Sequence, residues 1–590
     1  MPEPPIRIPI VTDAHPPRPG FALAIGVIGH RPNRLPEGAE NWLNAQIAPI
    51  LAAIREAGRN AARHHAHFFS AEPACFRVIS ALAEGSDRIG ARLGLQQDFM
   101  LAAPLPFPAS DYEKDFASGE SKDEFRLLLS QAASVLEFAG DRREAAKAYE
   151  RAGIAVLDAS DLLIAIWDGE PSAGRGGTTE LVYEAARRGM PVIRMDPSPG
   201  RPPQIYWREG IGNHAGPGYF DEPFAADLLA GTAMAVEQLV RPPKFASERE
   251  GMRGYLHRHI HRWNISLAFP LLMLLFAGRW PRWSDLRRQT PDEITGARAP
   301  SGLTPHLLVH AHVWADEIAI YFAQLFRGAF VLNFLLSAIV TIAVVWAPAA
   351  PWTLIEIALV LGLVLNTQLG RRGGWHHLWI EAREIAERLR VAAPIHAVGS
   401  RLAPTYGEAP SWTGWYVRAL LRQAGLRSAI LDDAQTQAVY SDLHALLEDQ
   451  RAYHTATALR FRTLHRRLSR SATLLCVAAL LVSVSFFVIE MGELFFVSPG
   501  LHHWVIVATA GLPALAAASY GIRVIGDFDG AAARSARMAS QIAGILHGMG
   551  KGQLSIDALR ETSHRAAKVM LGDVANWRLV VESRELEMPG

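Results

Sequence analysis

The chain has 590 residues, too many for a single hydrophobic core, and this length predicts two to four domains. Hydrophobic residues make up 49% of the chain, charged residues 20%, and the mean hydropathy is +0.08, as expected when one soluble part is joined to one membrane part. The formal net charge of +1 gives no reason to expect nucleic acid as a partner, and two distant cysteines, Cys75 and Cys476, exclude a disulfide framework.

Residues 1–20 are rich in proline and are predicted to be a disordered leader. Between residues 21 and 240, apolar runs of strand length alternate with helical patterns. The best strand candidates are continuous apolar runs at 22–28, 76–82, 100–103, 162–167 and 192–195, and a helix is expected at 40–57. Continuous apolar runs are typical of strands that helices cover on both faces. The order therefore predicts an α/β domain with a Rossmann-like, parallel sheet.

The composition changes after residue 240. Residues 241–328 are expected to form a linker that contains a membrane-associated segment at 265–278, which is too short for a full crossing. Four stretches have the length and apolarity of membrane spans and form two hairpins, at 329–347 with 352–370 and at 472–489 with 503–520. Helical patterns continue in a cytoplasmic helix up to residue 400, in a helical region at 401–471 and after the last span to residue 590. This half is therefore predicted to be an all-α, multi-span membrane domain.

Arginine placement predicts the orientation in the bilayer. The hairpin tips at 348–351 and 490–503 contain no Lys or Arg, whereas the opposite ends of the spans carry several arginines, such as Arg371, Arg467 and Arg523. Because basic residues favour the cytoplasmic side, the tips are expected outside the cell. The soluble domain and both termini are then expected in the cytoplasm, at the inner (cytoplasmic) membrane, with the lipid bilayer as a partner.

Three glycine-containing turns follow predicted strands and supply the candidate ligand-binding residues. Glycines let a ligand approach the backbone, and the free N–H groups and dipole at a helix start attract phosphate. In open α/β sheets, ligands bind beyond the carboxyl ends of the strands, so the three turns are expected to meet there. The alternative is that each is only a strand-to-helix turn. The candidates are Gly29, His30 and Arg31, then Gly85, Ser86 and Asp87, then Asp168, Gly176, Gly177, Thr178, Thr179 and Glu180.

These turns resemble motifs of the SLOG superfamily, which is named after the DNA-processing Smf proteins and the Lonely Guy hydrolases. Residues 80–87, Ser-Ala-Leu-Ala-Glu-Gly-Ser-Asp, resemble the family's Ser-Gly-Leu-Ala-x-Gly-x-Asp turn, and residues 176–180, Gly-Gly-Thr-Thr-Glu, resemble its helix start. The Leu-Pro-Phe-Pro run at 105–108, followed by Tyr112, and residues 161–169 match in order, so the resemblance covers residues 21–197. It implies a domain that binds a nucleotide or a nucleotide-derived second messenger, with no certain cofactor.

Some SLOG proteins hydrolyse nucleoside monophosphates, and in those the glutamate follows the threonine by three residues. Here Glu180 follows Thr178 by two, so the chain departs from the hydrolase pattern. If the chain is an enzyme, the resemblance implies that Glu180 is its catalytic residue. Otherwise Glu180 is expected to bind a ribose hydroxyl or to favour the positive end of its helix.

The membrane half resembles SLATT domains, two-span bacterial effectors linked to nucleotide signalling. The resemblance is carried by the hairpins and by residues 379–390, Trp-Ile-Glu-Ala-Arg-Glu-Ile-Ala-Glu-Arg-Leu-Arg, although this chain has two hairpins. The leading hypothesis is a sensor–effector of bacterial defence, acting as a homo-oligomer that forms a pore or disrupts the membrane. The alternatives are a membrane-anchored nucleotide or ADP-ribose-type hydrolase and a passive membrane scaffold. The histidine clusters at 64–67 and 257–261 lack carboxylates at ligand spacing, so no metal site is predicted.

Overall fold

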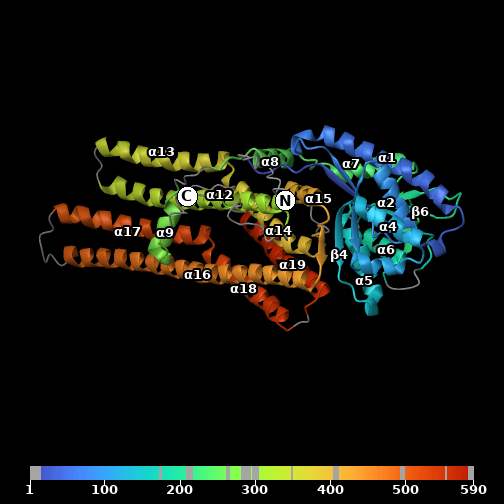
Figure 1. The fold of residues 1–590 in the computed structure, drawn as a ribbon. Coiled ribbons are helices and arrows are strands. Elements are labelled where there is room, and N and C mark those ends of the chain that lie inside the picture. The colour runs from blue at the N-terminus through green and yellow to red at the C-terminus, as the bar shows by residue number, and fades with distance from the viewer. Residues whose placement is uncertain are drawn as a thin grey trace, which may run out of the picture.

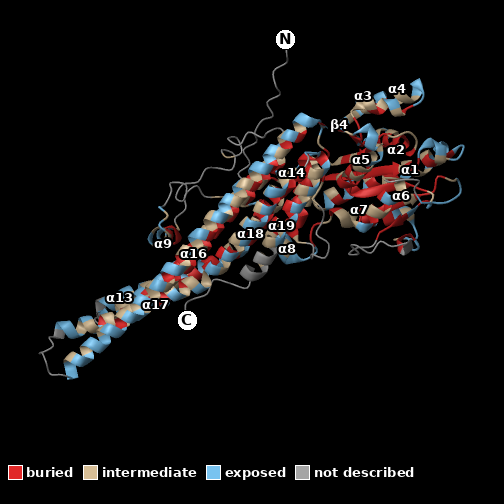
Figure 2. Ribbon diagram, turned by 90° about the horizontal axis from the view of Figure 1, so that it is seen from below, coloured by how far each residue is buried: buried red, intermediate tan, exposed pale blue. Residues whose placement is uncertain are grey.

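The computed structural model describes residues 15–171, 176–207, 217–260, 266–280, 294, 304–346, 350–402, 411–491, 499–551 and 554–582. Figure 1 shows two parts, an α/β part at one end of the molecule and a long helical part that extends away from it. The interior of the α/β part is buried, whereas the far end of the helical part is largely exposed (Figure 2).

An eight-stranded sheet forms the centre of the α/β part, in the order β7-β6-β5-β1-β2-β3-β4-β8. All neighbouring strands are parallel except β7, which runs antiparallel to β6. The predicted parallel sheet is therefore confirmed. The strands are β1 (Ala22–Gly29), β2 (Cys75–Ile79), β3 (Met100–Leu105), β4 (Ala132–Phe138), β5 (Leu162–Ile166), β6 (Val192–Met195), β7 (Gln204–Tyr206) and β8 (Ala429–Leu431).

Helices cover both faces of this sheet, which explains why its central strands are continuously apolar. Alternate residues of β1 enter two different cores: Leu23 packs in a cluster with α1, α7 and α15, and Ala24 in a cluster with α5 and α6. The helices of this part are α1 (Ala39–His64), α2 (Ser86–Gln96), α3 (Ala109–Tyr112), α4 (Gly119–Gln131), α5 (Ala145–Ala159), α6 (Thr178–Arg187) and α7 (Leu228–Val240).

The sheet extends beyond the predicted domain limit at residue 240. Strand β8 pairs with the edge strand β4, and α15 (Trp412–Ala424) buries Trp415 and Leu420 in the same core as α1. The domain limits 21–240 are therefore corrected, because residues 412–431 complete the α/β part. A three-residue strand has no periodicity of its own, and it forms here because β4 offers a free edge.

The predicted leader is corrected in its second half. His15–Gly20 is described and packs on the domain: the Pro19 carbonyl accepts a hydrogen bond from the Ser70 amide at 2.9 Å. The Tyr416 hydroxyl donates to the Pro17 carbonyl at 2.7 Å, and the Gln423 side chain accepts from the Gly20 amide at 2.7 Å. These contacts with α15 supply the order that a proline-rich composition does not reveal. Residues 1–14 lie outside the described part of the chain.

Four helices of the helical part are long and apolar enough to cross a membrane, and they contain the four predicted spans as far as these are described. They are α12 (His306–Trp346), α13 (Ala350–Arg372), α16 (Asp433–Met491) and α17 (Pro499–Ile525). Helix α12 packs on α13 and α17, and α17 packs on α16, so the helices follow one another in the order α13, α12, α17, α16 (Figure 1). Their outer faces expose large apolar side chains, such as Leu361, Leu480 and Phe487, which suggests a membrane protein.

A polar network joins the first hairpin within its apolar stretch. Asn333 of α12 donates a hydrogen bond to the Thr367 hydroxyl of α13 at 2.9 Å, and Asn366 donates to the Asn333 side chain at 2.7 Å. Asn366 also donates to the backbone carbonyl of Ala329 at 3.0 Å. Such polar contacts hold neighbouring helices together where the surroundings are apolar.

The remaining helices connect these four to the sheet. Helix α9, inside the predicted membrane-associated segment, packs on α12 and α16 through Phe269, Leu272 and Met273. Helix α19 packs on α14, α16 and α18, so it touches helices that continue into the apolar region. Their bounds are α8 (Ala246–Leu256), α9 (Ala268–Ala277), α14 (Trp375–Ala397), α18 (Phe528–Met549) and α19 (Ile556–Glu582).

Candidate functional site

The three predicted turns meet at the carboxyl ends of the central strands. Strand β1 lies between β5 and β2, so the chain reverses its direction of travel across the sheet at this point. Such a switch point is where open α/β sheets form ligand crevices. A cavity of about 340 Å³ is found there. Seven of the twelve predicted residues line it: Gly29, His30, Arg31, Asp87, Gly176, Gly177 and Thr178.

The start of α6 forms one wall of this cavity. Gly176 has a φ of +77°, and a Cβ placed on it would lie 2.9 Å from the Cα of Glu150, so only glycine fits. Gly177, the N-cap residue, has ordinary extended backbone with φ −74° and ψ 164°. The Thr178 hydroxyl donates to the Gly29 carbonyl at 3.2 Å and fixes the helix start to the end of β1. A helix N-terminus held at a cavity is suited to bind phosphate.

Two arginines bring positive charge to the same cavity. The Arg31 guanidinium lies over the Tyr149 ring, 5.2 Å from its centroid, and Tyr149 in turn donates a hydrogen bond to Asp115. Arg34 also lines the cavity and pairs with Asp168 at 2.7 Å. In the described residues no carboxylate forms an ion pair with Arg31, although the charge of Asp115 acts on it, so its guanidinium can still donate hydrogen bonds to an anionic ligand.

His30 and Asp168 form a pair beside Arg34. The His30 Nε2 lies 3.0 Å from the Asp168 Oδ1 and 3.3 Å from the Asp168 backbone nitrogen. Burial lowers the pKa of His30 below its ordinary value, although the Asp168 carboxylate acts in the opposite direction. His30 is therefore neutral at pH 7, and its contacts with Asp168 fix the end of β1 to the turn after β5.

Asp87 is a buried carboxyl at the base of the cavity. Burial raises its pKa to about 7, against the opposing effect of the backbone amides of Ala83 and Gly29 and of the Arg31 charge. Near neutral pH the group is therefore half protonated. It can donate a hydrogen bond to a phosphate oxygen in one form and accept one from a sugar hydroxyl in the other.

Gly29, Gly85 and Ser86 hold two of the turns together. A Cβ on Gly29 would lie 2.6 Å from the Cβ of Ser86, and a Cβ on Gly85 would lie 2.8 Å from the carbonyl oxygen of His30. The buried Ser86 hydroxyl donates to that same carbonyl at 2.9 Å. Gly85 and Ser86 do not line the cavity in the described part of the chain. Their position fits the alternative given above, in which they only form a strand-to-helix turn.

Three further predicted residues support the wall from outside the cavity. The Thr179 hydroxyl donates to the Glu170 carbonyl at 2.7 Å, and the Glu180 carboxylate accepts a hydrogen bond from the Gly176 amide at 2.7 Å. Asp168 contacts two cavity residues, His30 and Arg34. Glu180 thus stabilises the turn that precedes its own helix.

The sequence interpretation missed Arg34 and Tyr149, which line the cavity. Arg34 follows Arg31 at a spacing of three residues, and the intervening Pro32 starts a short 3-10 helix over Pro32–Arg34 that turns both toward the site. That spacing was a usable signal. Tyr149 lies on an amphipathic helix, where an aromatic residue is usually part of the core, so the sequence offered no signal for it.

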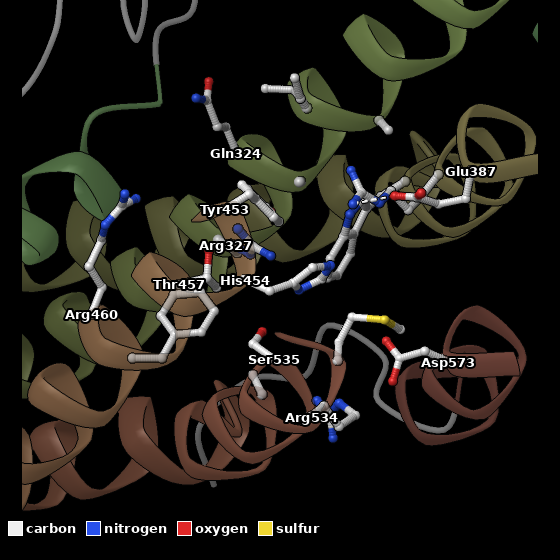
Figure 3. Close-up of a pocket in the computed structure, with 18 of the residues that line it drawn as sticks. Gln324, Arg327, Glu387, Tyr453, His454, Thr457, Arg460, Arg534, Ser535 and Asp573 are labelled. Atoms are coloured by element: carbon white, nitrogen blue, oxygen red, sulfur yellow. Dashed lines mark ion pairs between the residues drawn. The ribbon is translucent and has the colours of Figure 1, made fainter. Parts of the chain in front are cut away.

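A second cavity, of about 420 Å³, lies in the helical part where α9, α12, α14, α16, α18 and α19 approach one another. Figure 3 shows Arg327, Tyr453 and His454 on one side of it and Ser535 and Arg534 on the other. The Arg327 guanidinium lies over the Trp379 ring at 5.0 Å from its centroid, and burial lowers the pKa of His454 to about 4. This polar space lies next to the cytoplasmic ends predicted for the spans.

Comparison with models of known families, with curated proteins and with solved structures found no match. The resemblance to SLOG and SLATT proteins therefore stays a prediction from the motifs. Within the described residues, no group of three His, Cys, Asp or Glu side chains is arranged to hold a metal ion.

Proposed function

We propose that this chain is a membrane protein regulated by a ligand: its α/β part binds a phosphate-bearing, nucleotide-derived molecule, and its four long helices cross the bilayer as the effector. The observation that carries the proposal is the single cavity at the carboxyl ends of β1, β2 and β5. Residues from three separate turns line it, together with a helix N-terminus and two arginines. Each of these features favours an anion, and their convergence is not required by the packing of the sheet.

The exposed apolar faces of α13 and α16 support the membrane part of the proposal. Side chains such as Leu354 and Leu474 are more than 60% exposed, at 69% and 67%, which is unfavourable in water and favourable in lipid. The orientation proposed is the one that the arginines indicate, with the α/β part and both termini in the cytoplasm. The cytoplasmic membrane is the proposed location.

Helix α5 is the proposed connection between the ligand and the membrane helices. Its residues Tyr149 and Gly153 line the ligand cavity, and the intervening Arg151 forms two contacts of 2.7 and 2.6 Å with Asp557 of α19. Farther along, Asp158 pairs with Arg560 of α19. A ligand that binds differently to two positions of α5 would shift α19, and with it the helices that α19 contacts.

The proposed response is oligomerisation with pore formation or membrane disruption, in a bacterial defence role that the family resemblance implies. The geometry of Glu180 supports binding rather than hydrolysis, since its carboxylate is engaged by the Gly176 amide and does not line the cavity. No residue is therefore assigned a catalytic role.

The test uses the full-length protein in detergent or nanodiscs and a panel of nucleoside mono-, di- and triphosphates and cyclic mono- and dinucleotides. A ligand present at about 100 times its Kd should stabilise the protein by about 2.7 kcal/mol, seen as a higher melting temperature. Arg31→Gln should remove this shift. Arg143→Gln is the matched control, because Arg143 is 89% exposed and pairs only with Asp141 among the described residues. No shift with any compound, or equal shifts in the two variants, would overturn the proposed site.

A further inference from the structure

A larger cavity, of about 1080 Å³, lies at the opposite edge of the sheet, between the α/β part and the helical part. Asp158, Asp161 and Arg188 contribute to it from the amino-terminal side of the strands. Arg401, from the turn after α14, and Arg560, from α19, contribute from the helical part. The cavity is thus built by segments that the sequence keeps far apart, and none of its residues belongs to the site described above.

Basic side chains outnumber acidic ones in the described lining of this cavity, and two of its aspartates, Asp158 and Asp161, each pair with two arginines. Asp161 accepts hydrogen bonds from Arg422 at 2.8 Å and from Arg401 at 3.1 Å. Asp158 pairs with Arg188 at 2.6 Å and with Arg560. Arg188 also pairs with Glu184 at 2.7 Å. Among the described lining residues, five carboxylates (Asp158, Asp161, Glu184, Asp557 and Glu561) face seven cations (Arg188, Arg241, Lys244, Arg401, Arg418, Arg422 and Arg560), so the surplus charge of the lining is positive.

Arg418 of α15 also lines the cavity, and in the described part of the chain no atom accepts a hydrogen bond from its guanidinium. Three cations, Arg422, Arg401 and Arg388, act on it against one carboxylate, Asp161. A Cβ placed on Gly414 would lie 3.4 Å from an Arg418 Nη1 and 3.9 Å from an Arg388 Nη1. Burial and the charges of Arg422, Arg401 and Arg388 lower the pKa of Arg418 to about 10, against the opposing effect of the Asp161 carboxylate, so Arg418 stays charged at pH 7. A partly enclosed cation among cations is unfavourable unless an anion joins it.

Apolar side chains also line the cavity, and one of them is an exposed aromatic ring. Phe245 lines the cavity and is 73% exposed, so its ring is available to a ligand. Trp207 and Met190 lie in the same wall. Arginines beside an available aromatic face are the combination that binds phosphate groups attached to a flat organic ring.

We propose that this interdomain cavity is a second binding site, for a phosphate-bearing organic anion, with Arg418 as its central phosphate contact and Phe245 as a stacking surface. Because both parts of the chain line the cavity, an occupant would fix the α/β part, including α15, to α19 and to the turn after α14. The site is independent of the ligand cavity at the other edge of the sheet, and either site can exist without the other.

The experiment measures thermal stability and calorimetric binding of the full-length protein in nanodiscs, with inorganic triphosphate and with ATP as probes. The wild type should bind both, and ATP more tightly because its ring can stack. Arg418→Gln should lower the affinities for triphosphate and for ATP by about 10- to 100-fold, the loss expected when a charge-assisted hydrogen bond is removed. Phe245→Ala should lower the affinity for ATP and leave the affinity for triphosphate unchanged.

Arg418→Gln has a second expected result that separates a ligand contact from a structural residue. Without any anion it should raise the melting temperature, because it removes an uncompensated charge. A lower melting temperature, failure to fold, or unchanged affinity would each overturn the proposal. Arg418→Lys keeps the charge, so its affinity for the two probes should lie between those of the wild type and the glutamine variant.

Arg31→Gln is the control for the other cavity. If Arg31→Gln abolishes triphosphate binding and Arg418→Gln leaves it intact, the interdomain site is overturned and the proposed function survives. If the reverse holds, the interdomain site stands and the site at the carboxyl ends of the strands loses its support. Absence of binding by either probe to the wild type would also overturn the second site.

Discussion

Arg422, in α15, donates a hydrogen bond through its Nε to Oδ1 of Asp161, which lies immediately before β5, at a distance of 2.8 Å. The two residues are 261 positions apart in the sequence, and both side chains are buried, with 8% and 3% of their surface exposed. The other carboxylate oxygen of Asp161 accepts the backbone amide of Ala24 in β1 at 3.1 Å. One carboxylate thus joins the two central strands to a helix that the sequence places in the other half of the chain.

Asp161→Asn is predicted to destabilise the protein strongly. Burial alone would raise the pKa of Asp161, but the charges of Arg422 and Arg401 outweigh it and lower the pKa, so the carboxylate is ionised at pH 7. Its removal leaves buried guanidiniums unpaired, which costs about 3–5 kcal/mol. The expected result is a marked fall in melting temperature. Arg55→Gln, which removes a surface pair with the exposed Asp98, is the control and should change little. Equal effects of the two variants would contradict the role of Asp161.

Ligand affinity is predicted to fall as pH rises through about 7, because of Asp87. The pKa of Asp87 in the folded protein is about 7, well above the ordinary value of 3.8, so the carboxyl group stays protonated until the pH approaches 7. Below pH 7 the neutral carboxyl tolerates a phosphate, and above it the carboxylate repels one. At an effective dielectric constant of 20, like charges several ångströms apart repel by roughly 2 kcal/mol, or about 30-fold in affinity.

The measurement is a series of binding isotherms from pH 5.5 to about 8.5 with a phosphodiester ligand, which does not titrate in this range. Asp87→Asn should remove the pH dependence of the affinity. The asparagine side chain still offers an oxygen that can accept a hydrogen bond from the Ala83 or Gly29 amide. Because the pKa of Asp87 is raised in the folded state, the free energy of unfolding of the wild type should fall relative to that of Asp87→Asn as pH rises from about 4 to 7. Above pH 7 the difference between the two free energies of unfolding should be constant. Parallel pH profiles of the two proteins would show that Asp87 does not face the ligand.

The strands and spans that could be predicted are those with a strong local signal. The buried runs of β1 and β5 can be recognised from composition because helices cover the sheet on both faces. The apolar stretches of α16 and α17 can be recognised from their length and hydropathy. Strands β7 and β8 could not be predicted, since each has three residues and forms only because an edge strand offers free hydrogen-bonding groups. The order of residues 15–20 depends likewise on α15, which the sequence places far away.

The candidate site was predictable where backbone chemistry decides it. Gly176 and Thr178 mark a helix start by residue type, and the structure places both on the cavity. Ser86 was predicted as a ligand-binding candidate, and its hydroxyl donates a hydrogen bond to the His30 carbonyl at 2.9 Å inside the fold. The interdomain cavity around Arg418 had no sequence signal, because its charges come from five separate segments and only tertiary packing brings them together.

Communication between the two parts of the molecule is predicted to depend on the contact of Arg151 with Asp557. Both nitrogen–oxygen contacts are short; the Arg151 side chain is 14% exposed and the Asp557 side chain 54%, so only the arginine is shielded from solvent. Arg151→Asp should leave ligand affinity within about twofold and abolish the membrane response, since it removes a link without touching the cavity. The double variant Arg151→Asp with Asp557→Arg should restore the response. A response that survives Arg151→Asp would show that coupling does not pass from α5 to α19 here.

The membrane topology is predicted to place the start of α17 outside the cell and α4 inside. In a background without Cys75 and Cys476, Gly500→Cys should react with an impermeant maleimide added to intact cells; a Cβ there meets no atom within 4 Å. Leu127→Cys, on the exposed face of α4 at 58% exposure, should react only after the cells are permeabilised. The opposite pattern would place the α/β part outside and exclude a cytoplasmic ligand.

The central claim is that a ligand bound at the carboxyl ends of the strands changes the state of the membrane helices. The most direct measurement is the release of a trapped dye from liposomes that contain the full-length protein, on addition of the nucleotide that stabilises it. The account predicts release by the wild type, and no release by Arg31→Gln although that variant inserts normally. Dye that stays inside the liposomes while calorimetry shows the nucleotide bound to the wild type would contradict the account.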